Sequence, residues 1–145
     1  MTPSTFATAP TPGTIRFDGD ATEYRPGVCN IGPEEIARRR RAGHAGLVAS
    51  VALLAVLVAL DAPPLLRLTV ALPAAAAASG YLQARLKFCA GFGSRGVFNF
   101  GPLGRTDAVA DADSRARDRT RANQIGLASL AIGVVVGVAA VILPL

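Results

Sequence analysis

The sequence has 145 residues, of which 51% are hydrophobic, and its 15 basic and 10 acidic residues give a formal net charge of +5. This length allows one domain at most, and so high an apolar fraction argues against an ordinary soluble domain. The basic residues flank apolar blocks and have no interleaved aromatic residues, which argues against a nucleic-acid-binding surface.

The N-terminal part of the chain is polar. Residues 1–24 are rich in Thr, Pro, Ala and Gly, and we expect a disordered cytoplasmic tail without a cleavable signal peptide. Residues 25–42 are predicted to form a juxtamembrane segment and helix. The helix should begin at Pro33, because proline suits the first helical position and Glu34 and Glu35 then face the positive end of the helix dipole.

Two apolar blocks follow, and we expect each to cross a membrane as a helix. The first, residues 43–60, is uncharged and ends before Pro63 and Pro64, which cannot continue a helix. The second, residues 65–82, carries Arg67 near one end, and we expect this side chain to reach the outer headgroups. The short connection predicts an antiparallel hairpin.

The last part of the chain combines a polar loop with the longest apolar block. Residues 83–124 are predicted to form a cytoplasmic loop, in which the second helix continues to about Gly91 and an irregular stretch covers residues 92–102. Residues 107–123 alternate in charge and predict a polar helix that leads into the third span. That span, residues 125–145, contains no charged residue.

The third span contains a motif that favours helix packing. Gly133 and Gly137 form a Gly-x-x-x-Gly face, which allows close helix contact and could support association between copies of the chain. Such motifs also occur by chance in spans rich in Gly and Ala, so a packing role is one of two interpretations.

The distribution of Lys and Arg predicts the orientation. Six of these residues precede the first span, eight lie between residues 84 and 123, and none lies in the turn at residues 61–64. The sequence therefore predicts an all-α, multi-pass integral membrane protein of a bacterial inner (plasma) membrane. Its three transmembrane helices run from a cytoplasmic N-terminus to an external C-terminus.

The run from Arg38 to Arg41 is the most informative charged feature. Near an anionic leaflet each such residue contributes about 1 kcal/mol, which is enough to set the orientation. Orientation alone can explain the run, and a specific contact of Arg38, Arg39, Arg40 and Arg41 with lipid or a partner is the alternative. The cluster between Arg115 and Arg121 has the same two interpretations.

The two cysteines and the single histidine are candidates for thiol or metal chemistry. Cys29 and Cys89 both fall on the predicted cytoplasmic side, where they could act together or, with His44, bind a metal. Cys29 precedes a helix N-terminus and nearby arginines, which would favour its thiolate. The alternative is two packed cysteines and an interfacial histidine, because the chain has no Cys-x-x-Cys motif. Asp107, Asp111 and Asp113 lack the spacing of a calcium loop and indicate a solvated helix face.

Two segments rich in Gly, Pro, Asn and aromatic residues, 24–33 and 88–101, are expected to pack together as a small cytoplasmic cap. The sequence shows no catalytic set, and we expect no cofactor. The leading hypothesis is a non-enzymatic accessory subunit or self-associating scaffold with a basic cytoplasmic face. It would contact anionic lipids and belong to a homo-oligomer or larger complex. A thiol or metal-binding protein using Cys29 and Cys89 is the alternative, and a small oligomeric channel is a weaker one.

Overall fold

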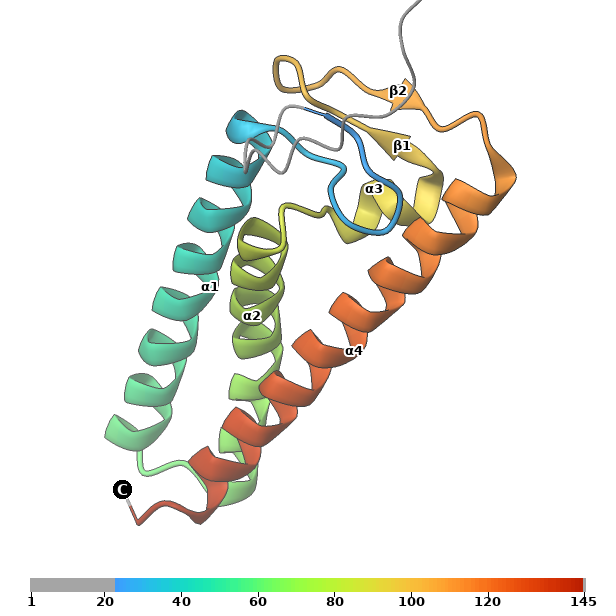
Figure 1. The fold of residues 1–145 in the computed structure, drawn as a ribbon. Coiled ribbons are helices and arrows are strands. Elements are labelled where there is room, and N and C mark those ends of the chain that lie inside the picture. The colour runs from blue at the N-terminus through green and yellow to red at the C-terminus, as the bar shows by residue number, and fades with distance from the viewer. Residues whose placement is uncertain (1–22, 145) are drawn as a thin grey trace, which may run out of the picture.

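The computed structural model describes residues 23–144, so nearly all of the predicted tail lies outside the described residues. The described chain is a bundle of helices with a small cap at one end (Figure 1). Its elements are α1 (Pro33–Ala59), the 3₁₀ helix η1 (Pro64–Val70), α2 (Ala71–Arg85), α3 (Ala90–Arg95), β1 (Val97–Phe98), β2 (Asp107–Ala108) and α4 (Ala112–Ile142).

Three helical stretches are long and apolar enough to cross a membrane. They are α1, the combined stretch Pro64–Arg85 and α4. Large hydrophobic side chains lie on their outer surfaces: Val48, Leu72 and Leu127 are 68%, 75% and 69% exposed. Apolar surface of this extent fits contact with lipid, as in a multi-pass membrane protein.

Local residues set both ends of helix α1. Pro33 occupies the start of the helix, as predicted. At the other end Asp61 adopts a left-handed conformation with φ of 50°. The N–H of Asp61 donates to the Val58 carbonyl at 3.0 Å, and the N–H of Ala62 donates to the Leu57 carbonyl at 2.9 Å. This is a Schellman motif, and it ends the helix before the two prolines are reached.

The prediction that the second helix continues to about Gly91 is wrong. Helix α2 ends at Arg85, and Lys87 adopts a left-handed conformation with φ of 53°. The N–H of Phe88 donates to the Gln83 carbonyl at 3.0 Å, which completes a second Schellman motif. The turn places Phe88 in the core between the helices, where its ring is fully buried. This core consists of Phe88, Ala122 and Ile125, with Leu82, Leu86 and Ala90 packed against it.

The region between the second and third spans contains more regular structure than expected. The stretch 92–102, predicted to be irregular, contains most of α3 and the strand β1. β1 pairs antiparallel with β2, so Val97 lies opposite Ala108 and Phe98 opposite Asp107. The polar helix predicted from residue 107 therefore begins only at Ala112, after the strand.

The start of α4 has its own capping residue. The Oδ2 atom of Asp111 accepts hydrogen bonds from the Ser114 N–H at 2.8 Å and from the Ser114 hydroxyl at 2.6 Å. These hydrogen bonds favour the carboxylate and lower the pKa of Asp111. Asp111 is therefore a helix N-cap rather than part of a solvated helix face.

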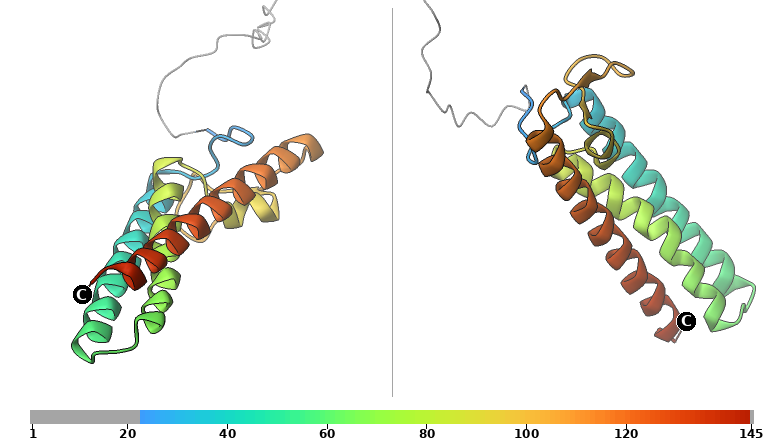
Figure 2. Two further views of the ribbon diagram at one scale, coloured as in Figure 1. Left: turned by 90° about the horizontal axis from the view of Figure 1, so that it is seen from below. Right: turned by 90° about the vertical axis from the view of Figure 1, so that its right-hand side faces the viewer.

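Helix α2 lies between α1 and α4 and contacts both of them (Figures 1 and 2). Its contact with α1 depends on small residues. A methyl group added to Gly80 would lie 2.6 Å from the Gly43 Cα and closer still to the Gly43 nitrogen. One added to Gly46 would lie 2.6 Å from the Ala77 nitrogen. The two backbones are thus in direct contact, which larger side chains would prevent.

The glycines of the third span make the same kind of contact with η1 and α2. A methyl group on Gly133 would lie 2.6 Å from both the Ala71 carbonyl oxygen and the Ala75 Cβ. One on Gly137 would lie 2.8 Å from the Ala71 Cβ and 3.1 Å from the Leu68 carbonyl oxygen. The Gly-x-x-x-Gly face is therefore covered by this chain's own helix.

The prediction that Arg67 reaches the outer headgroups is wrong. This side chain is 6% exposed, and its Nη1 donates to the Leu143 carbonyl at 3.4 Å. It thus lies against the C-terminal end of α4, where the helix dipole favours a cation. The arginine joins the hairpin to the third helix at the end of the bundle away from the cap.

Candidate functional site

Three segments that are distant in the sequence meet in the cap. The N–H of Gly32 donates to the Asn99 carbonyl at 2.8 Å, and the N–H of Asn99 donates to the Asn30 carbonyl at 3.0 Å. The N–H of Asn30 in turn donates to the Lys87 carbonyl at 3.2 Å. The expected packing of the two Gly-, Pro- and Asn-rich segments is confirmed, and the base of α4 completes the cap.

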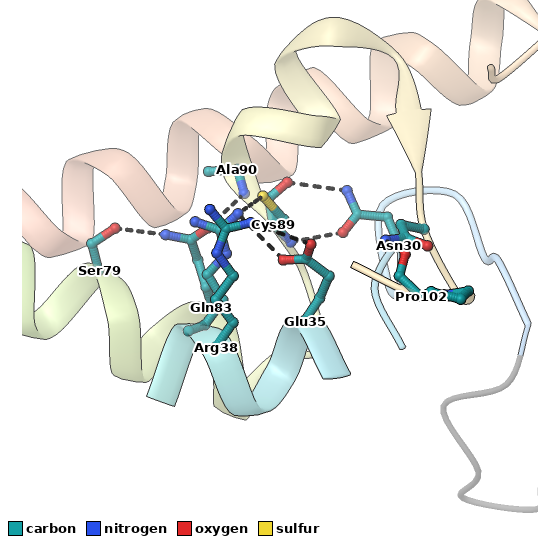
Figure 3. Close-up of polar contacts among 10 residues, drawn as sticks. Asn30, Glu35, Arg38, Ser79, Gln83, Cys89, Ala90 and Pro102 are labelled. Atoms are coloured by element: carbon teal, nitrogen blue, oxygen red, sulfur yellow. Dashed lines mark hydrogen bonds and ion pairs between the residues drawn. The ribbon is translucent and has the colours of Figure 1, made fainter. Parts of the chain in front are cut away.

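The side chain of Asn30 holds the backbone of Cys89 from both sides (Figure 3). Its Oδ1 accepts from the Cys89 N–H at 2.7 Å, and its Nδ2 donates to the Cys89 carbonyl at 3.1 Å. Both residues are almost completely buried. Because a buried amide needs such partners, this pair fixes the N-terminal segment to the start of α3.

An ion-pair cluster around a buried carboxylate lies beside this contact, at the start of α1. Glu35 is 1% exposed and lies 3.6 Å from the Arg38 guanidinium and 3.7 Å from that of Arg39. The Nη2 of Arg39 also donates to the Cys89 sulfur at 3.0 Å. One guanidinium, that of Arg39, thus lies between a carboxylate and a thiol. The Arg38 side chain pairs with the same carboxylate from the surface, where it is 59% exposed.

Gln83 joins α2 to α3 within the same region (Figure 3). Its Nε2 donates to the Ser79 hydroxyl at 2.7 Å, and its Oε1 accepts from the Ala90 N–H at 3.0 Å. The second hydrogen bond satisfies a backbone donor at the start of α3 that has no partner inside the helix.

The base of α4 is fixed to the N-terminal segment by a buried carboxylate. Asp118 is fully buried and accepts from the Tyr24 hydroxyl at 2.9 Å and from the Gly27 N–H at 2.7 Å. The Tyr24 ring stacks on that of Phe98 with centroids 4.7 Å apart. Burial, followed by the hydrogen bond to Asp118, raises the pKa of the Tyr24 phenol well above its ordinary value.

The two cysteines are buried and free, and they have different surroundings. The Cys29 sulfur lies 3.8 Å from the Ile31 carbonyl oxygen. Burial raises the pKa of this thiol, so the expectation that Cys29 is predisposed to ionise is wrong. The thiol beside a guanidinium is that of Cys89. Among residues 23–144 no group of three or more His, Cys, Asp or Glu side chains could hold a metal ion.

His44 lies outside the cap, on the outer face of the α1–α2 pair. Its Nδ1 is 2.6 Å from the Tyr81 hydroxyl, and the two rings meet edge to face with centroids 5.3 Å apart. A pocket of about 380 Å³ opens here, and it is lined by Arg40, His44, Tyr81, Ala84 and Arg85. Arg40 therefore faces a different site from Arg38 and Arg39.

No known protein family matches this sequence, and no curated protein or solved structure is similar to it. The geometry of the described residues is therefore the basis for a functional proposal.

The second arginine cluster also divides between two environments. Arg115 donates through Nη1 to the carbonyls of Val109 at 2.8 Å and Ala110 at 2.9 Å, which holds the strand-to-helix connection. Arg117 and Arg121 line a separate pocket of about 410 Å³. Its remaining lining residues are Pro26, Gly27, Ala116, Thr120 and Gln124.

Sequence reasoning did not identify the polar residues that hold the cap together. The sequence places Asn30 in a segment rich in Gly, Pro and Asn, and Glu35 in the first turn of a helix, and neither position predicts a partner. Asp118 is one of several charged residues in the stretch 107–123, and that pattern predicts only a polar helix. The spacing of Glu35 and Arg39, a carboxylate four residues before an arginine, is a local signal that could have predicted their pairing.

Proposed function

We propose that this protein is a non-enzymatic, multi-pass membrane protein that presents its cap at the cytoplasmic face of a bacterial inner membrane. In this role it serves as an accessory subunit of a larger membrane assembly. The N-terminus lies in the cytoplasm and the C-terminus outside, as the positions of the arginines favour.

One observation carries the proposal: backbone-to-backbone contact closes the bundle along both of its helix interfaces. Gly80 meets Gly43 between α1 and α2, and Gly133 meets Ala71 between α4 and α2. Such packing leaves the large apolar side chains on the outside, where lipid covers them. A bundle built in this way is suited to anchoring a cap.

The same contacts favour an accessory subunit over a self-associating scaffold. The Gly133 and Gly137 face was the candidate surface for contact between copies, and α2 covers it within the chain. The outer surface of the bundle carries leucine and valine side chains, which lipid solvates as well as a second copy would. The cap is then the surface that remains for a specific partner.

Reporter fusions and mass measurements test this proposal. Reporters inserted at residue 62 and at the C-terminus should both be active only outside the cytoplasm. In mild detergent, the complex isolated from native membrane should have a mass that is not a multiple of the chain's 14.8 kDa. A cytoplasmic reporter at either position would refute the topology. A mass equal to a whole number of copies would refute the accessory role.

Thiol chemistry at Cys89 is a second candidate, supported by the Arg39 guanidinium 3.0 Å from its sulfur. The guanidinium is placed to donate a hydrogen bond to this sulfur, and the thiolate is the form of a cysteine that acts as a nucleophile and a metal ligand. The test is the rate of alkylation in the folded protein, compared between Cys89→Ser and Cys29→Ser. Alkylation of Cys89 at least as fast as that of a free thiol would support the candidate. Protection of both thiols until detergent unfolds the chain would exclude it.

A further inference from the structure

The pocket between α1 and α2 has a composition suited to an anion. Arg40 and His44 are four residues apart on α1 and so share one face, as do Tyr81 and Arg85 on α2. Because the helices are antiparallel, Tyr81 meets His44 at 2.6 Å and the two arginines lie at the cap side of this contact. The pocket therefore combines two guanidinium groups with an imidazole and a phenol.

No carboxylate competes for these arginines. Among residues 23–144, neither Arg40 nor Arg85 makes an ion pair or a side-chain hydrogen bond, and no acidic residue lines the pocket. The nearest acidic residues along α1 are engaged elsewhere: Glu35 pairs with Arg38 and Arg39, and Glu34 accepts from the Leu103 N–H at 3.1 Å. The two guanidinium groups are free to bind a ligand.

The position of the pocket identifies the kind of anion. Arg40 lies three residues before the predicted first span, and Arg85 lies three residues after the predicted second span, so both are at headgroup level. Tyrosine and histidine at this depth present an apolar body to lipid and a polar tip to the headgroups. On the same face of α1 as His44, one turn further into the span, Leu47 and Val48 are 49% and 68% exposed.

We propose that this pocket binds the phosphate of an anionic phospholipid, with Arg40 and Arg85 as its charged ligands. Guanidinium groups bind phosphate oxygens through paired hydrogen bonds, and a basic pocket between two membrane helices is a recognised setting for acidic headgroups. The hydroxyl of Tyr81, when it donates to His44 Nδ1, leaves the His44 Nε2–H as a further donor. Leu47 and Val48 would contact an acyl chain, which a free phosphate lacks.

The inference rests on the proposed membrane anchoring, so its test measures insertion and headgroup preference separately. Flotation with liposomes reports insertion. Native mass spectrometry then counts retained lipid when phosphatidylglycerol and phosphatidylcholine with identical acyl chains are supplied in equal amounts. The wild-type protein should retain phosphatidylglycerol in clear preference.

The decisive comparison uses variants with equal net charge. Arg40→Gln and Arg85→Gln should each lower phosphatidylglycerol retention about tenfold or more, the effect of removing a charge-assisted hydrogen bond. Arg41→Gln removes the same charge from an exposed neighbour that does not line the pocket, and it should change retention by about twofold or less. Helicity of each variant, measured by circular dichroism, should equal that of the wild type.

Three results would overturn the inference. They are equal losses in Arg40→Gln and Arg41→Gln, equal retention of the two lipids by wild-type protein, and displacement of phosphatidylglycerol by excess inorganic phosphate. The last result would assign the pocket to a soluble phosphate compound. If the protein inserts but any of these is observed, only this inference fails. If it does not float with liposomes, the membrane proposal fails and the inference fails with it.

Discussion

Replacing Gly80 with alanine is the sharpest test of how the bundle is held together. The added methyl group would lie 2.6 Å from the Gly43 Cα and 2.8 Å from the Arg39 carbonyl oxygen. Ordinary contact between carbon atoms is about 3.5–4.0 Å, so α1 and α2 would have to separate by about 1 Å. The obstructing atoms belong to the backbone, so no side chain can rotate away to relieve the clash.

The expected loss of stability follows from two opposing terms. Overpacking of a well-packed interface costs about 1–3 kcal/mol, and the backbone contacts place Gly80→Ala near the upper limit. Alanine restores up to about 1 kcal/mol through its better helix propensity. The free energy of unfolding should therefore fall by about 2 kcal/mol, which is roughly a thirtyfold change in the unfolding equilibrium.

The measurement is unfolding in mixed micelles with increasing SDS, followed by circular dichroism. Gly126→Ala is the matched control, because nothing lies within 4 Å of the position of its methyl group. This variant should be as stable as the wild type or more stable by about 0.5–1 kcal/mol. Equal stability of Gly80→Ala and Gly126→Ala would refute the direct backbone contact between α1 and α2.

Three further predictions concern the third helix and the cap. Gly133→Leu should lower the free energy of unfolding by at least as much as Gly80→Ala does. It should leave the mass of the detergent complex unchanged, because this face packs within the chain. A lower mass would instead indicate that the face joins separate chains. Asp118→Ala should lower the free energy of unfolding by about 2–3 kcal/mol in the same SDS assay, because the Tyr24 hydroxyl and the Gly27 N–H both lose their acceptor. A loss below about 0.5 kcal/mol would contradict the burial of these hydrogen bonds. The raised pKa of Tyr24 means that the folded protein keeps a proton that the unfolded chain releases above its ordinary pKa of 10.0. The contribution of this group to stability is therefore complete below pH 10 and decreases as the pH rises further. The free energy of unfolding, measured between pH 8 and pH 11, should show this decrease in the wild type and a smaller one in Tyr24→Phe. The same dependence on pH in both proteins would contradict the raised pKa of Tyr24.

Much of the helical framework could be predicted from the sequence, because it depends on local composition. Long apolar runs identify the helices that can cross a membrane, and Pro33 identifies the start of the first one. The ends of the helices are harder to predict from the sequence. Asp61 and Lys87 adopt left-handed conformations that glycine usually supplies, so the two Schellman motifs have no glycine to indicate them.

The cap could be predicted as a contact between segments but not as a set of partners. The hydrogen bonds of Asn30 and Asp118 join residues 59 and 91 positions apart, and no local pattern indicates such distant pairs. The burial of Arg67 has no local signal for a related reason. Its environment is set by where α4 ends, and the apolar run of the second span contains no information about that position.

The distance in sequence between the parts of the cap has a consequence for biogenesis. The hydrogen bond between Tyr24 and Asp118 spans 94 residues and joins the entry to the first helix with the entry to the last. Two candidate spans separate these residues, so they lie on the same side of a bilayer only if both spans cross it or neither does. The cap can then close as soon as the hairpin of the first two spans has been inserted. A chain in which only one of these spans crosses would leave the Asp118 carboxylate without its Tyr24 partner, so a closed cap reports correct insertion of the hairpin.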